Sequence, residues 1–130
     1  MTQSVGIVLV SHSPQLAAGL RELTGQLGGG AVPVAVAAGT EDGGIGTSYE
    51  LITAAVAQAD RGAGVLLIPD LGSSVLTARA VLEDLGRADV LLVDAPFVEG
   101  AVAAVVTAST GAALAEVAAA AREAWSARKF

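Results

Sequence analysis

The chain has 130 residues, of which 53% are hydrophobic and only 3% aromatic, and its formal net charge at pH 7 is −6. This length suits one domain, which we expect to span residues 1–130 around a core of aliphatic side chains. The acidic balance argues against sequence-independent nucleic-acid binding, no apolar run approaches the roughly 20 residues that span a bilayer, and the absence of cysteine excludes disulfides and thiolate metal sites.

The first strand is predicted at residues 5–10, a continuous run rich in β-branched residues. Ser13 and Pro14 then begin a helix, since serine caps helices well and proline suits the first helical position. We expect this helix to end at the glycines 28–30. A weaker apolar run at 32–37 predicts the second strand. The side chains that we expect the first helix to bury form one stripe: Leu16, Leu20, Leu23 and Leu27.

A capping-box pattern predicts the start of the second helix, with Thr47 as the cap and Glu50 three residues later. This helix is expected to run to Asp60. The third strand follows at 64–69, and a third helix begins at residue 73 or 74 and ends at 85. The side chains that we expect this third helix to turn inward are Val75, Leu76, Leu82 and Leu85.

Residues 90–93 predict the fourth strand, and Pro96 opens a fourth helix that ends at about Ala108. Thr110 is expected to cap a fifth helix, in which an apolar stripe that includes Trp125 packs inward. The order β-α-β-α-β-α-β-α-α predicts an α/β fold with right-handed crossovers. We therefore expect a small doubly wound parallel four-stranded sheet, ordered about 2-1-3-4, with helices on both faces.

In such a fold, ligands bind at the carboxyl ends of the strands, where the strand order reverses. His12, the only histidine of the chain, directly follows the first strand at this edge. A neutral imidazole nitrogen is a good nucleophile, and a phosphoryl group on it can be passed on. We expect such a group to face the start of the first helix, which favours anions. The alternative is that His12 is only a hydrogen-bonded loop residue.

Asp70 ends the third strand, which is the expected neighbour of the first. A carboxylate there can accept the N–H of His12 and fix the tautomer of the ring, although Asp70 can also serve only as a cap of the third helix. Further hydroxyls and backbone donors can surround a phosphate, or can be ordinary loop residues. These phosphate-binding candidates are Ser13, Gly46, Thr47, Ser73 and Ser74. We assign no metal ligand and no tightly bound cofactor.

Four segments taken together resemble one known family. They are IVLVSHSPQLAAGL, GGIGTSYELI, IPDLGSS and DAPFVEGAVAAVV. In this order they resemble the phosphotransferase subunit of bacterial dihydroxyacetone kinase, which is grouped with the mannose-type enzyme IIA domains of the phosphoenolpyruvate sugar phosphotransferase system. The resemblance runs from Gly6 to about Trp125.

The resemblance implies a small parallel α/β domain that forms a homodimer, with His12 phosphorylated and paired with Asp70. It places the five phosphate-binding candidates named above around the phosphoryl group. It further implies that the histidine carrier HPr is the donor and that ADP, held by the nucleotide-binding subunit of the kinase, is the acceptor. A separate kinase subunit binds dihydroxyacetone. The N-terminus lacks signal-peptide features, so we expect a cytoplasmic protein that binds neither nucleic acid nor membrane.

Two other functions fit parts of the sequence. A small chelatase-like metal-binding protein of α/β type also carries a histidine after its first strand, but this chain can add only carboxylates beside His12. A receiver-like domain is phosphorylated on an acid that ends a strand, as Asp70 does, but it needs acidic metal ligands where this chain has Ser11 and Ser13. A non-catalytic interaction module would not be phosphorylated at all.

Overall fold

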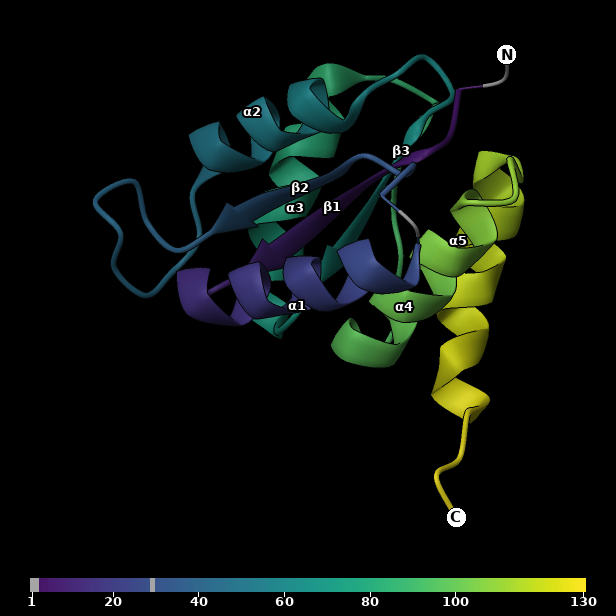
Figure 1. The fold of residues 1–130 in the computed structure, drawn as a ribbon. Coiled ribbons are helices and arrows are strands. Elements are labelled where there is room, and N and C mark those ends of the chain that lie inside the picture. The colour runs from purple at the N-terminus through teal and green to yellow at the C-terminus, as the bar shows by residue number, and fades with distance from the viewer. Residues whose placement is uncertain (1–2, 29) are drawn as a thin grey trace.

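Four parallel strands lie at the centre of the molecule in the order β2-β1-β3-β4 (Figure 1). The structure is a computed structural model that describes residues 3–28 and 30–130. This arrangement confirms the fold class and the strand order expected from the sequence. In chain order, the elements are β1 (Gly6–Ser11), α1 (Pro14–Leu27), β2 (Val34–Ala38), α2 (Tyr49–Ala59), β3 (Val65–Pro69), α3 (Gly72–Leu85), β4 (Val90–Leu92), α4 (Phe97–Ala108), α5 (Leu114–Glu123) and the 3₁₀ helix η1 (Ala124–Ser126).

Helices cover both faces of the sheet. One face packs against α1, α4 and α5, and the other against α2 and α3 (Figure 1). Alternate side chains of β1 point into opposite layers, so Ile7 and Leu9 contact the first group while Val8 and Val10 contact the second. Because both faces of the sheet are covered by apolar layers, the strands are continuous hydrophobic runs in the sequence. Within the residues that the structure describes, none of the helices is long and apolar enough to cross a membrane.

The buried stripe predicted for α1 is only partly right. Leu20 is buried, but the helix turns Ala17 and Thr24 toward the core beside it. Thr24 is tolerated there because its hydroxyl donates to the carbonyl oxygen of Leu20 at 3.0 Å. The small side chains of Ala17 and Thr24 let α1 pack closely against the sheet. The three other leucines of the predicted stripe are exposed: Leu16, Leu23 and Leu27.

The inward stripe predicted for α3 is also only partly right, because Leu82 and Leu85 pack against the core as expected. Leu76 was expected to face inward and is exposed, whereas Ser74 is buried together with Ala78 and Val81. The hydroxyl of Ser74 donates to Oδ1 of Asp70 at 2.7 Å. This polar contact lets the hydroxyl of Ser74 be buried on the same side of the helix as Ala78 and Val81.

The predicted caps of two helices are wrong by one to three residues. The N-cap of α2 is Ser48, whose hydroxyl accepts the N–H of Leu51 at 3.2 Å, so Thr47 is not the cap. The N-cap of α5 is Ala113 rather than Thr110. The hydroxyl of Thr110 donates instead to a carbonyl in the last turn of α4, that of Thr107, at 2.7 Å, and therefore ends one helix rather than starting the next.

Trp125 does not pack into the core as predicted. It lies on η1 and is 62% exposed, and its indole N–H donates to the carbonyl oxygen of Asp94 at 3.1 Å. The residues of α5 that are buried are smaller, which brings this helix close to α4. They are Val117, Ala118 and Ala121.

Candidate functional site

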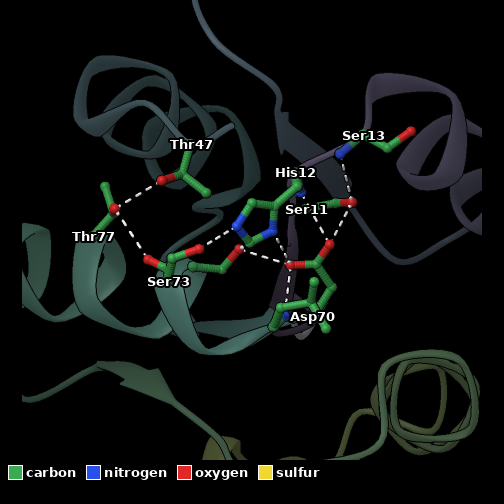
Figure 2. Close-up of polar contacts among 9 residues, drawn as sticks. Ser11, His12, Ser13, Thr47, Asp70, Ser73 and Thr77 are labelled. Carbon is green, nitrogen blue, oxygen red and sulfur yellow. Dashed lines mark hydrogen bonds and ion pairs between the residues drawn. The ribbon is translucent and has the colours of Figure 1, made fainter. Parts of the chain in front are cut away.

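His12 and Asp70 lie side by side at the carboxyl edge of the sheet (Figure 2). They meet because β1 and β3 are neighbours and Val10 pairs in register with Pro69. Nδ1 of His12 lies 2.9 Å from Oδ1 of Asp70, and the two side chains are 18% and 7% exposed. A carboxylate can only accept hydrogen bonds, so in the neutral imidazole Nδ1 carries the proton and Nε2 has the lone pair.

Asp70 accepts five hydrogen bonds. Oδ2 accepts from the hydroxyl of Ser11 and the backbone N–H of His12, both at 2.9 Å. Oδ1 accepts from the ring of His12, from the hydroxyl of Ser74 and from the N–H of Leu71. Burial raises the pKa of Asp70, but these hydrogen bonds to its charged form outweigh burial and lower the pKa from 3.8 to about 2. Asp70 is therefore ionised at neutral pH.

The lowered pKa of Asp70 predicts a loss of stability in acid. Because the folded pKa lies below the unfolded one, the contribution of the carboxylate is complete above about pH 4 and is lost as the pH falls toward 2. The difference corresponds to roughly 2 kcal/mol. Urea unfolding of wild type and Asp70→Asn at several pH values should show the stability gap between them narrowing by about this amount in acid. A gap that stays constant with pH would contradict the prediction.

Asp70 is not the N-cap of α3. The N-cap is Leu71, which makes no side-chain cap bond, and α3 begins at Gly72. Asp70 takes the N–H of Leu71 on Oδ1, at 2.7 Å, while the same oxygen faces the imidazole. The carboxylate therefore links the N-terminus of α3 to His12, which is more than the role of a helix cap.

Hydroxyl groups surround the imidazole (Figure 2). Oγ of Ser73 contacts Nε2, and Oγ of Ser74 lies 3.2 Å from Nδ1. The hydroxyl of Thr47 lies 2.8 Å from that of Thr77, which in turn donates to the carbonyl oxygen of Ser73 at 3.2 Å. Two of the predicted phosphate-binding residues, Ser73 and Ser74, thus contact the imidazole, and a third, Thr47, is connected to them through Thr77.

The remaining two candidates use their polar groups elsewhere. The hydroxyl of Ser13 accepts the N–H of Leu16 at 3.2 Å as the N-cap of α1, as predicted, and it points away from the imidazole (Figure 2). The N–H of Gly46 donates to the carbonyl oxygen of His12 at 3.0 Å. Its φ of +146° and the 2.8 Å that a Cβ would leave to Thr40 require glycine there. Gly46 therefore holds the backbone of His12 in place.

Sequence reasoning missed two residues of this site, Ser11 and Thr77. Ser11 is the one polar residue in the four strands, and a hydroxyl that ends an apolar strand next to a candidate histidine was an available signal. Thr77 lies four residues after Ser73, on the same side of α3. Its role depends on the approach of Thr47 from a distant part of the chain, which no local pattern reveals.

Two hollows flank the site. The larger, of about 730 Å³, extends from Asp70 along α3 to Trp125 and has mostly apolar walls. The smaller, of about 520 Å³, lies at the start of α2 next to Thr47, and its acidic lining residues are Glu41, Asp42 and Glu50. Across residues 3–28 and 30–130, no three potential ligands of the His, Asp or Glu type gather into a metal-binding group.

Comparison with known proteins identifies the family. A family model described as the PTS system fructose IIA component, abbreviated EIIA-man, matches residues 6–118. The chain belongs to this family. As an enzyme IIA domain it is a component of a phosphotransferase system, and the resemblance found in the sequence is confirmed.

Several relatives of this enzyme IIA domain are named as subunits of dihydroxyacetone kinases. In Listeria innocua, the phosphoryl donor subunit of PEP-dependent dihydroxyacetone kinase 2 is 35% identical, over 78% of this chain and 84% of that protein. In Lactococcus lactis, the phosphotransferase subunit of the PTS-dependent dihydroxyacetone kinase is 32% identical, over 82% of this chain and 85% of that protein. The phosphoryl donor subunit from Escherichia coli is 40% identical over 83% of this chain, which matches only 24% of that longer protein.

Solved structures agree with the fold of the enzyme IIA domain. A crystal structure of a protein of unknown function superposes with a TM-score of 0.84 at 32% identity and covers 92% of this chain and 94% of that one. A sigma-54 interaction domain protein from Enterococcus faecalis has a TM-score of 0.74 at 15% identity, over 97% and 93% of the two chains, and shares the fold alone.

Proposed function

We propose that this chain is the phosphoryl donor subunit of a dihydroxyacetone kinase system and that it carries the phosphoryl group on Nε2 of His12. One observation supports this most: the 2.9 Å contact between Nδ1 of His12 and Oδ1 of an ionised Asp70. This pairing holds the ring in the tautomer whose Nε2 is nucleophilic. The relatives named as phosphoryl donor or phosphotransferase subunits support the choice of kinase system.

In the proposed step, the lone pair of Nε2 attacks the phosphorus in line with the bond between phosphorus and the donor nitrogen. That bond breaks as the Nε2–P bond forms, and the electron pair leaves with the donor. The proton stays on Nδ1, so the ring of His12 becomes positively charged and the carboxylate of Asp70 stabilises it. In the second transfer, a phosphate oxygen of the acceptor attacks, the Nε2–P bond breaks, and His12 recovers its lone pair.

The geometry favours the start of α3 as the place where the phosphoryl group is held. Nε2 contacts the hydroxyl of Ser73 in the first turn of α3. The first N–H groups of a helix have no intrahelical partner, and this end of a helix favours anions. The sequence had suggested the start of α1 for this role. We propose α3 instead, with the hydroxyls of Ser73 and Thr47 as further donors to the phosphoryl oxygens.

The same proposal includes the partners. HPr supplies the phosphoryl group, ADP on the nucleotide-binding kinase subunit accepts it in the cytoplasm, and a further subunit binds dihydroxyacetone. Glu41, Asp42 and Glu50 line the hollow beside Thr47 and give this flank of the site a charge that attracts a basic docking face. We also propose a homodimer, which the exposed leucines of α1 support as an apolar contact surface.

Labelling tests the proposal directly. The purified chain is incubated with enzyme I, HPr and phosphoenolpyruvate that carries labelled phosphate. We expect a label that survives alkali and is lost in acid, on the peptide that contains His12. Adding the nucleotide-binding kinase subunit with ADP should remove the label and produce ATP, whereas adding the subunit without ADP should leave it in place.

The outcomes also separate the alternative functions. An alkali-labile label would point to an aspartyl phosphate, as in a receiver-like domain. Both oxygens of Asp70 already accept hydrogen bonds, which argues against that nucleophile. A chain that takes no label from HPr, although HPr itself is labelled, would refute the proposed donor. A label on His12 that the kinase subunit and ADP cannot remove would refute the proposed acceptor.

A further inference from the structure

Ser11 places a buried hydroxyl where the sheet otherwise has only apolar side chains. It is the last residue of β1 and is 0% exposed. Its hydroxyl donates to Oδ2 of Asp70 at 2.9 Å and accepts the N–H of Ser13 at 3.1 Å. Burying a hydroxyl is costly unless it is hydrogen-bonded, and this one is used as both donor and acceptor. Ser11 does not touch the imidazole, so any effect on His12 must pass through Asp70.

The two oxygens of Asp70 have separate tasks. Oδ2 accepts from the hydroxyl of Ser11, at the end of β1, and from the backbone N–H of His12, which follows it. Oδ1 faces Nδ1 of His12 and also accepts from the N–H of Leu71 and the hydroxyl of Ser74 (Figure 2). A carboxylate can rotate about the bond to its Cβ, and the donors on its two oxygens together set that rotation. The orientation of the oxygen that faces the ring therefore depends in part on the groups that hold the other oxygen.

We propose that Ser11 is a positioning residue that helps to fix the rotation of the Asp70 carboxylate and thereby to keep the ring proton of His12 on Nδ1. This inference deepens the proposed function and rests on it only where the transfer rate is concerned. Without the hydroxyl of Ser11, Oδ2 keeps a single donor, and the N–H of Ser13 loses its acceptor. The carboxylate is then held less firmly on the side of Oδ2, although the donors to Oδ1 remain. A larger share of the rings then carries the proton on Nε2, where it blocks attack on phosphorus.

The ring nitrogens of His12 report this effect directly. In the wild-type chain labelled with ¹⁵N-histidine, at a pH where the imidazole is neutral, NMR should show Nδ1 protonated and Nε2 unprotonated. In Ser11→Ala both nitrogen signals should move toward values typical of mixed tautomers. The rate of phosphoryl transfer from HPr should fall about tenfold, the scale of one hydrogen bond to a charged group. Ser11→Thr, which restores the hydroxyl, should recover both readouts.

A matched control separates positioning from stability. Ser48→Ala removes the same atom from another hydroxyl that has a structural role, the N-cap of α2, which makes no contact with Asp70. It should lower the melting temperature and leave the signals of the ring unchanged. If Ser11→Ala does not fold, Ser11→Cys keeps a group at this position whose thiol is a weaker donor, and it should move the signals in the same direction.

The inference is overturned if the ¹⁵N signals of His12 do not change when the hydroxyl of Ser11 is removed. Wild-type nitrogen signals in a folded Ser11→Ala or Ser11→Cys chain would show that Asp70 keeps its orientation without this hydroxyl. Equal shifts in Ser48→Ala would show a general loss of structure. The proposed function can fail separately: signals that move as expected in a chain that HPr never phosphorylates would leave the inference standing and remove the function.

Discussion

Replacing His12 with alanine should abolish phosphorylation of the chain by its donor. His12 is the only histidine of the sequence, so no second imidazole can take over the phosphoryl group. Removing a covalent nucleophile lowers rates by factors of about 10⁶ in well-studied enzymes, and we expect incorporation below roughly one thousandth of the wild-type rate. The measurement is the initial rate of label transfer from phosphorylated HPr under identical conditions.

The variant should remain folded, which makes the loss interpretable. Asp70 keeps four of its five donors in His12→Ala, because the backbone N–H of residue 12 stays and only the ring is removed. The melting temperature should therefore stay close to that of the wild-type chain, although transfer is lost. In the wild-type chain, NMR of the phosphorylated ring should place phosphorus on Nε2. Label that still enters a folded His12→Ala chain would refute His12 as the carrier.

The fold was predictable because it depends on patterns that the chain repeats. Each strand is a short run that is apolar on both faces, and helices separate the strands, which together imply a parallel sheet with two helical layers. The meeting of His12 and Asp70 follows from the same patterns, since it requires only that β1 and β3 are neighbours and end at the same edge. The loops that gather polar residues at this edge were therefore identified correctly.

The rotations of the helices were not predictable from apolar spacing. In α1 the leucine stripe and the stripe of Ala17, Leu20 and Thr24 have similar periodicity, and close packing favours the one with smaller side chains. In α3 the buried side includes a polar contact, that of Ser74 with Asp70. The spacing of apolar residues cannot predict a buried polar contact of this kind. The prediction therefore placed Leu76 in the core, where the structure has Ser74.

The polar partners within the site were only partly predictable for a related reason. A list of hydroxyl and glycine residues near a strand end does not say which groups are already used by the backbone. Ser13 caps its own helix and Gly46 binds the carbonyl of His12, whereas Ser11 and Thr77 contribute hydroxyls that the sequence did not assign to the site. These assignments depend on the register between strands and on side-chain rotamers, so they need coordinates.

Replacing Asp70 with asparagine should slow transfer by at least about 100-fold and also destabilise the fold. The side chain of Asp70 receives only donors, two on Oδ2 and three on Oδ1. Asparagine replaces one oxygen with an NH₂ group, so in either orientation this donor faces other donors. Loss of hydrogen bonds to a charged group and an unsatisfied buried donor together suggest a cost of about 3 kcal/mol.

The effect on transfer has a separate cause, which lies in the tautomer of His12. An asparagine NH₂ that faces the ring makes Nδ1 the acceptor and moves the proton to Nε2, the atom that must attack phosphorus. An asparagine oxygen that faces the ring keeps the tautomer but supplies no charge to stabilise the phosphorylated imidazolium. Both orientations therefore impair transfer, by different routes that the ¹⁵N signals of the ring distinguish.

Asp60→Asn is the matched control for this change. Asp60 is the C-cap of α2, and its carboxylate pairs with Arg87 at 2.9 Å. Exposed pairs of this kind contribute about 0–1 kcal/mol, so Asp60→Asn should cost little stability and leave the transfer rate unchanged. Rates are compared at a temperature where all three chains are folded by circular dichroism. If folded Asp70→Asn transfers at the wild-type rate, then Asp70 only supports the structure, because neither the tautomer nor the charge of the ring would limit the reaction.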